Sequence, residues 1–84
     1  MPGRDVSRIF VAMRDKLIQL LHQSERSVGE TMLRVERQRA IVSGMDEREP
    51  DTDAAKSLLR QFESNLGLFV THRDQLLRMV EETV

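Results

Sequence analysis

Residues 9–21 read Ile-Phe-Val-Ala-Met-Arg-Asp-Lys-Leu-Ile-Gln-Leu-Leu, and nine of these thirteen positions are apolar. On a helix, so many apolar residues cover more of the circumference than the stripe of about 100° that one neighbouring helix buries. A chain of 84 residues forms a single small domain with a thin core. We therefore expect a second copy of the chain, or another protein, to cover part of this segment.

Apolar residues recur every three or four positions on both sides of residues 9–21, which predicts a first helix over about 5–45. Asp5 or Ser7 is expected to cap its first turn. The stripe that faces the neighbouring helix comprises Val6, Phe10, Met13, Leu17, Leu20, Leu21, Ser24, Val28, Thr31, Met32, Val35, Gln38, Arg39, Val42 and Met45.

A cluster of turn residues predicts a loop over about 46–52, followed by a second helix over about 53–83. Gly44 suits a helix end, Pro50 cannot continue a helix, and residues 51–53 can cap the next one. The stripe of the second helix comprises Ala55, Leu59, Phe62, Leu66, Phe69, Arg73, Leu76 and Val80.

Together the two stripes predict an all-α fold, in which two long antiparallel helices form a hairpin that spans residues 1–84 as one domain. The spacing is that of a coiled coil, and we expect the hairpins to assemble into a helical bundle. Folding back from the loop places Val35 beside Leu66 and Leu21 near Val80. The first helix, of about 41 residues, is longer than the second, of about 31 residues, and each extra residue adds roughly 1.5 Å. About fifteen residues at the start of the chain therefore have little or nothing opposite them. An alternative is a chain break near residues 23–29, which contain two serines and a glycine and would give three helices.

Composition limits the function classes. The net charge of −1 gives no general attraction to nucleic acid or to an anionic membrane. The chain has no cysteine, which excludes disulfides and thiolate metal sites and fits the cytoplasm. Charged residues interrupt the apolar run at 9–21, so we expect neither a membrane span nor a targeting segment.

The sequence contains no complete catalytic or metal-binding pattern. His72-Arg73-Asp74 spells a protein-kinase loop, but position 79 is Met where that loop has Asn, and a kinase fold does not fit in 84 residues. His22 lacks the flanking residues of a phospho-accepting histidine. Two histidines without positioned carboxylates make a poor zinc site. We therefore expect no enzyme activity, no metal and no cofactor.

Two groups of polar residues have structural interpretations. Arg26, Glu30, Arg34 and Arg37 share one face, which we expect to be solvated, with Glu30 paired to Arg34. The alternative is an RNA-binding hairpin similar to Rop, although the acidic loop at 46–53 would repel phosphate. The second group, Ser24, Thr31 and Gln38, lies on the core stripe, and Arg73 is expected to donate to this polar layer.

The sequence thus predicts a protein interaction module: an adaptor, a scaffold subunit or a partner-stabilising chaperone that forms a homodimer or a hetero-oligomer. The expected interface residues are Ile9, Phe10, Met13, Leu17, Ile18, Leu20 and Leu21. In size and layout, and through Leu-Leu-Arg-Gln-Phe-Glu-Ser-Asn-Leu-Gly-Leu at 58–68, the chain resembles the small helical-hairpin partner chaperones of type III secretion. That resemblance implies pairing with a second subunit to guard a needle protein, and it assigns no residue roles.

Overall fold

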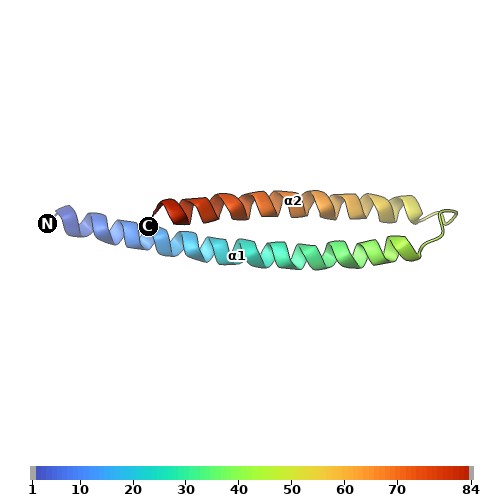
Figure 1. Cartoon of the computed structure of the whole chain (residues 1–84), viewed down its shortest axis with the longest axis horizontal. Helices are drawn as coiled ribbons and strands as arrows, with labels where there is room; N and C mark the ends of the chain where they lie inside the picture. The colour runs from blue at the N-terminus through green and yellow to red at the C-terminus, as the bar shows by residue number, and fades with distance from the viewer. Residues whose placement is uncertain (1, 84) are drawn as a thin grey trace.

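The computed structural model describes the backbone of residues 2–83 and the side chains of residues 6–83. It contains two helices, α1 (Pro2–Gly44) and α2 (Thr52–Glu82), which run antiparallel along one another as a hairpin (Figure 1). The molecule is a rod that measures 72 × 15 × 14 Å. The predicted all-α hairpin is confirmed.

The first helix differs from its predicted form in two respects. It begins at Pro2, a residue favoured at the first helical position because its φ is already helical and its missing N–H would have no partner there. Ser7 therefore lies inside the helix and does not cap it, and the backbone of Asp5 is helical as well, while its side chain lies outside the described residues. The helix also continues without interruption through residues 23–29, so the structure does not contain the alternative three-helix arrangement.

The loop between the helices is held by its own hydrogen bonds. The Thr52 hydroxyl donates to the carbonyl oxygen of Asp46 over 2.8 Å, and the Arg48 amide donates to the Asp46 carboxylate over 3.0 Å. Asp51 occupies the cap position of α2, as predicted, but its side chain makes no capping bond. The first bond ties the loop to the start of α2, and the second holds the loop's own turn.

A single narrow seam between the helices forms the core. The α1 residues buried in this seam alternate between apolar and polar at three- and four-residue intervals: Leu21, Ser24, Val28, Thr31, Val35 and Gln38. Within α2, only Thr52 and Leu76 are buried, and the rest of its stripe is half-buried or exposed. Near the loop, the Gln38 amide donates to the carbonyl oxygen of Ala55 over 3.0 Å. A seam this thin leaves one broad side of each helix open.

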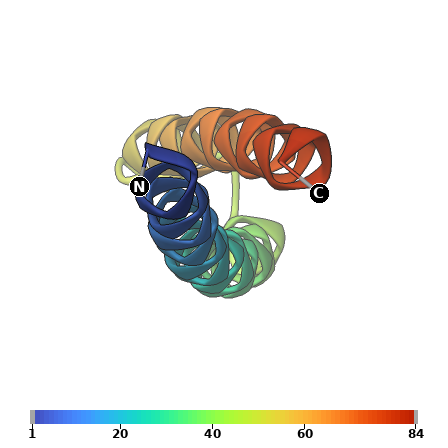
Figure 2. The same cartoon turned by 90° about the vertical axis from the view of Figure 1, so that its left-hand side faces the viewer.

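Viewed end-on, α1 and α2 wind around one another (Figure 2). Buried residues at 21, 28 and 35 of α1 are seven apart, as are those at 24, 31 and 38. A helix with 3.6 residues per turn can keep a seven-residue stripe on its neighbour only if the two helices coil. The winding is thus the direct consequence of the heptad spacing.

Candidate protein-binding surface

The N-terminal end of α1 extends beyond the C-terminal end of α2 (Figure 1). The helices have 43 and 31 residues, a difference of roughly 18 Å at 1.5 Å per residue. We call residues 6–16 the overhang. Its large apolar side chains are exposed: Val6 50%, Ile9 56%, Phe10 58%, Val11 61% and Met13 52%. In the part of the chain whose side chains the structure describes, each of them leaves half or more of its surface in water, and Met13 alone of the five lines a hollow with α2, through Met79.

The residues predicted to form the interface fall into three groups. Ile9, Phe10 and Met13 are exposed on the overhang, whereas Leu17, Ile18 and Leu20 are half-buried. Leu21 is 8% exposed and belongs to the seam between the helices. In the hairpin, the surface available to a partner therefore centres on the overhang rather than on the whole of residues 9–21.

A mostly apolar hollow of about 400 Å³ lies where α2 ends against α1. It is lined by Ala12, Met13, Lys16, Leu17 and Met79. Met79 lies outside the stripe predicted for the second helix, so sequence reasoning missed it. The sequence did contain a signal for it: Met79 is an apolar residue seven positions after His72, so both lie on the same flank of the helix, beside its buried side.

A second, smaller hollow of about 170 Å³ follows towards the middle of the hairpin. Its lining residues are Leu20, Gln23, Ser24, Ser27, Phe69 and His72. The Ser24 hydroxyl is buried without a hydrogen-bond partner. Arg73 does not donate to it as predicted; its guanidinium donates instead to the neighbouring Asp74 carboxylate over 3.1 and 3.2 Å. Adjacent residues form that pair more easily because no second helix has to be reached.

The two hollows lie on the same side of the hairpin. Met13 in the first hollow and Leu20 and Ser27 in the second are spaced by heptads along α1, and His72 and Met79 are spaced likewise along α2. Residues seven apart lie nearly above one another on a helix. The hollows are therefore consecutive parts of one strip, which we call the open-end groove.

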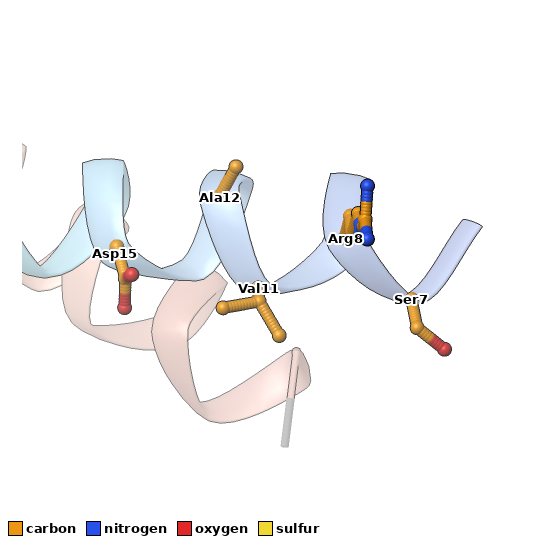
Figure 3. Close-up of a pocket in the computed structure, with 5 residues that line it drawn as sticks. All are labelled: Ser7, Arg8, Val11, Ala12 and Asp15. Carbon is orange, nitrogen blue, oxygen red and sulfur yellow. The ribbon is translucent and has the colours of Figure 1, made fainter. Parts of the chain in front are cut away.

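A third depression lies on the overhang itself, between Ser7 and Asp15. Figure 3 shows that Ser7, Val11 and Asp15 project from one side of α1 while Ala12 points away from them. The side chains do not converge on a common point. This surface can be covered by another chain, but its geometry does not position groups for chemistry.

The other candidate residues are dispersed. Arg26, Glu30, Arg34 and Arg37 are all exposed, in line with a solvated face. Among the described side chains the ion pairs are Arg39–Glu63, Lys56–Glu47 and Arg73–Asp74, so the predicted Glu30–Arg34 pair is not formed.

The histidines do not form a site together with carboxylates. His22 is exposed and is absent from the hollow that His72 lines. Over the part of the chain that the structure describes, no three His, Asp or Glu side chains gather closely enough to hold a metal ion.

Comparisons of the chain with protein families, curated proteins and solved structures found no match. The resemblance to small helical-hairpin chaperones therefore rests on size, layout and the run at 58–68. Within residues 2–83, neither helix has a stretch of the length and apolar character needed to cross a lipid bilayer. What the chain offers is thus an amphipathic hairpin whose open end carries an uncovered apolar surface.

Proposed function

We propose that this protein is a non-catalytic interaction module that binds helical segments of a protein partner on the overhang and the open-end groove. The observation that supports the proposal is the exposure of five large apolar side chains on the overhang, each by half or more. Small soluble proteins rarely leave contiguous apolar patches in water unless the patch is a binding surface. An adaptor, a scaffold subunit and a partner-stabilising chaperone all use such a surface.

The energetics favour a helical partner. Burying a side chain the size of Phe or Met contributes about 1.5–3 kcal/mol when it moves from full exposure to full burial. Phe10, Ile9 and Met13 retain about half of their surface, so each still has roughly 1 kcal/mol to contribute on this scale. The groove follows the helix axes, which matches the docking of a helix with apolar residues at three- and four-residue spacing.

The proposal includes no catalytic step. The hollows are lined mostly by apolar side chains, with Lys16 in the first and Gln23, two serines and His72 in the second. His72 does not position either serine as a nucleophile, because the Ser27 hydroxyl donates to the carbonyl oxygen of Gln23 and the Ser24 hydroxyl has no hydrogen-bond partner. A reducing compartment such as the cytoplasm suits a chain without cysteine.

Site-specific photo-cross-linking in the native host tests the proposal. A photo-reactive amino acid replaces Phe10, and a matched control places it at Arg60, an exposed residue of α2 that lines neither hollow. We expect position 10 to capture a protein, either a second copy or a different chain, with a yield well above that of position 60. Equal, background-level capture at both positions would overturn the proposed function.

A further inference from the structure

Charge is segregated to the two ends of the rod. The overhang carries Arg8, Arg14 and Lys16 against the single acid Asp15. The loop region, residues 46–53, carries five acids (Asp46, Glu47, Glu49, Asp51 and Asp53) against the single base Arg48. Because the rod is 72 Å long, these opposite charges cannot meet within one copy. At physiological salt, the reach of such charges is only about 8 Å.

The face that contains the open-end groove has a second regularity. Continuing its heptad steps along α1 gives Met13, Leu20, Ser27, Arg34 and Ile41. Along α2 the same steps give Leu58, Asn65, His72 and Met79. On both helices the apolar residues lie at the ends of the series and the polar ones at or near the middle. Ile41 and Leu58, near the loop, are exposed just as Met13 and Met79 are at the open end.

Each series therefore has a similar order of apolar and polar residues when it is read from either end, so it can pack against an antiparallel copy of itself. An antiparallel copy related by a two-fold axis near Ser27 places Met13 over the partner's Ile41, and Met79 over the partner's Leu58. Asn65 then faces the partner's His72, and Ser27 faces the partner's Ser27. Leu20 meets the partner's Arg34, whose aliphatic stem can cover it while its guanidinium remains in water. Isologous contacts require this kind of self-complementary surface.

The same axis also brings one of the overhang cations, Arg8, to the acidic loop of the other copy. Counting equally in both directions from Ser27, Arg8 at the overhang falls beside the partner's Asp46 at the loop. The overhang of each copy, which extends past the end of α2 in the hairpin, is then covered by the loop-side half of the other copy. We infer that a second copy of this chain occupies the groove face, antiparallel and with each overhang on the partner's loop end.

The area of this face is sufficient for a stable dimer. The stretch of α1 between Arg8 and Gly44, where the helix ends, is about 54 Å long at 1.5 Å per residue. With the 15 Å width of the rod it offers about 810 Å² per copy, close to the roughly 800 Å² per partner of a standard interface. The overhang alone, about 15 Å long, offers far less. A contact confined to the open ends would therefore bury too little surface for a stable dimer.

The inference rests on the proposed function and names the partner, and cysteine cross-linking tests it because the natural chain has no cysteine. Met13→Cys and Ile41→Cys variants are prepared separately, mixed, and treated with a short bismaleimide. The two Met13 positions of the dimer lie about 42 Å apart, so Met13→Cys alone should yield at least about tenfold less linked dimer than the mixture. Ser27→Cys alone should link efficiently, because it lies at the axis. Sedimentation should show a dimer that does not grow with concentration.

Three results would overturn the inference. Efficient linking of Met13→Cys alone would show that the open ends pair with one another. A mass that rises steadily with concentration would show head-to-tail polymers rather than a closed dimer. A wild type that stays monomeric at every accessible concentration would show that another protein covers the face. In that last case, photo-cross-linking of a different protein at position 10 would preserve the proposed function. If position 10 captured no protein, both the proposed function and this inference would be overturned.

Discussion

The loop-side half of α1 and its overhang carry similar apolar residues but place them in opposite surroundings. Val28 and Val35 are 5% and 3% exposed against α2, whereas Phe10 in the overhang is 58% exposed, although its heptad position is that of the buried Thr31 and Gln38. All of these residues lie on one continuous helix. The two regions therefore differ not in helix formation but in whether a second helix lies alongside them, because α2 ends at Glu82. The helical pattern alone specifies the secondary structure, while the length of the neighbouring helix decides which apolar side chains remain exposed.

The paired half is itself only thinly buried. Its seam has four buried apolar residues, Leu21, Val28, Val35 and Leu76, and they alternate with polar ones. Isolated pairs of helices gain little from helix propensity and depend on packing for stability. A partner on the open side would therefore add stability to the seam as well as cover the overhang. Substitutions in the seam and in the overhang separate these two contributions.

The largest expected effect distinguishes the seam from the overhang. Leu76→Ala removes buried contacts and should lower the free energy of unfolding by about 2 kcal/mol, at the lower end for such substitutions because the seam can relax. Phe10→Ala should change it by no more than about 0.5 kcal/mol in dilute protein, since Phe10 is exposed there. Urea unfolding followed by circular dichroism at several protein concentrations measures both.

The dependence on concentration is the decisive part of this comparison. Raising the protein concentration should stabilise the wild type, because association removes folded chains from the unfolding equilibrium. The Phe10→Ala variant should lose most of that gain, whereas Leu76→Ala should be destabilised at every concentration. If Phe10→Ala destabilised the dilute protein as much as Leu76→Ala does, the overhang would be part of the fold rather than a binding surface.

The same comparison explains what the sequence could predict. The heptad spacing, Gly44 and Pro50 are local signals, so the two helices, the loop and the surplus length of α1 followed from them. The hydrogen-bond partner of Arg73 could not be predicted in this way. Whether a flexible side chain binds a neighbouring carboxylate or a distant hydroxyl depends on the three-dimensional structure. Met79 was missed for a related reason. Met79 lines the hollow only because α2 ends beside Met13, and the relative position of the two helices is not a local property of the sequence.

A smaller effect concerns Ser24, which lies where the paired half borders the open-end groove. Its hydroxyl is buried without a partner, so Ser24→Ala should raise the free energy of unfolding by about 0.5–1 kcal/mol in dilute protein. Ser27→Ala is the matched control. The Ser27 hydroxyl donates to the carbonyl oxygen of Gln23, and its loss should offset the better helix propensity of alanine. Thermal unfolding of both variants provides the measurement. A destabilised Ser24→Ala protein would show that this hydroxyl has a partner, and a concentration dependence would place that partner on the second chain.

The smallest expected effect concerns the ion pair that joins the helices in the paired half. Arg39 and Glu63 approach to 4.0 Å, with 61% and 43% of their side chains exposed. Solvent screens such a pair and fixing two long side chains costs entropy, so its coupling energy should be below about 0.5 kcal/mol. A double-mutant cycle with Arg39→Ala, Glu63→Ala and the double variant isolates that coupling, because it cancels the effect of each residue on its own helix. If the coupling exceeded about 1 kcal/mol, charge would contribute to the seam as strongly as a buried hydrogen bond does. The loop-side half would then differ from the overhang in its ion pair as well as in its buried apolar surface. With a weak coupling, burial against α2 remains the physical difference between the two halves of α1.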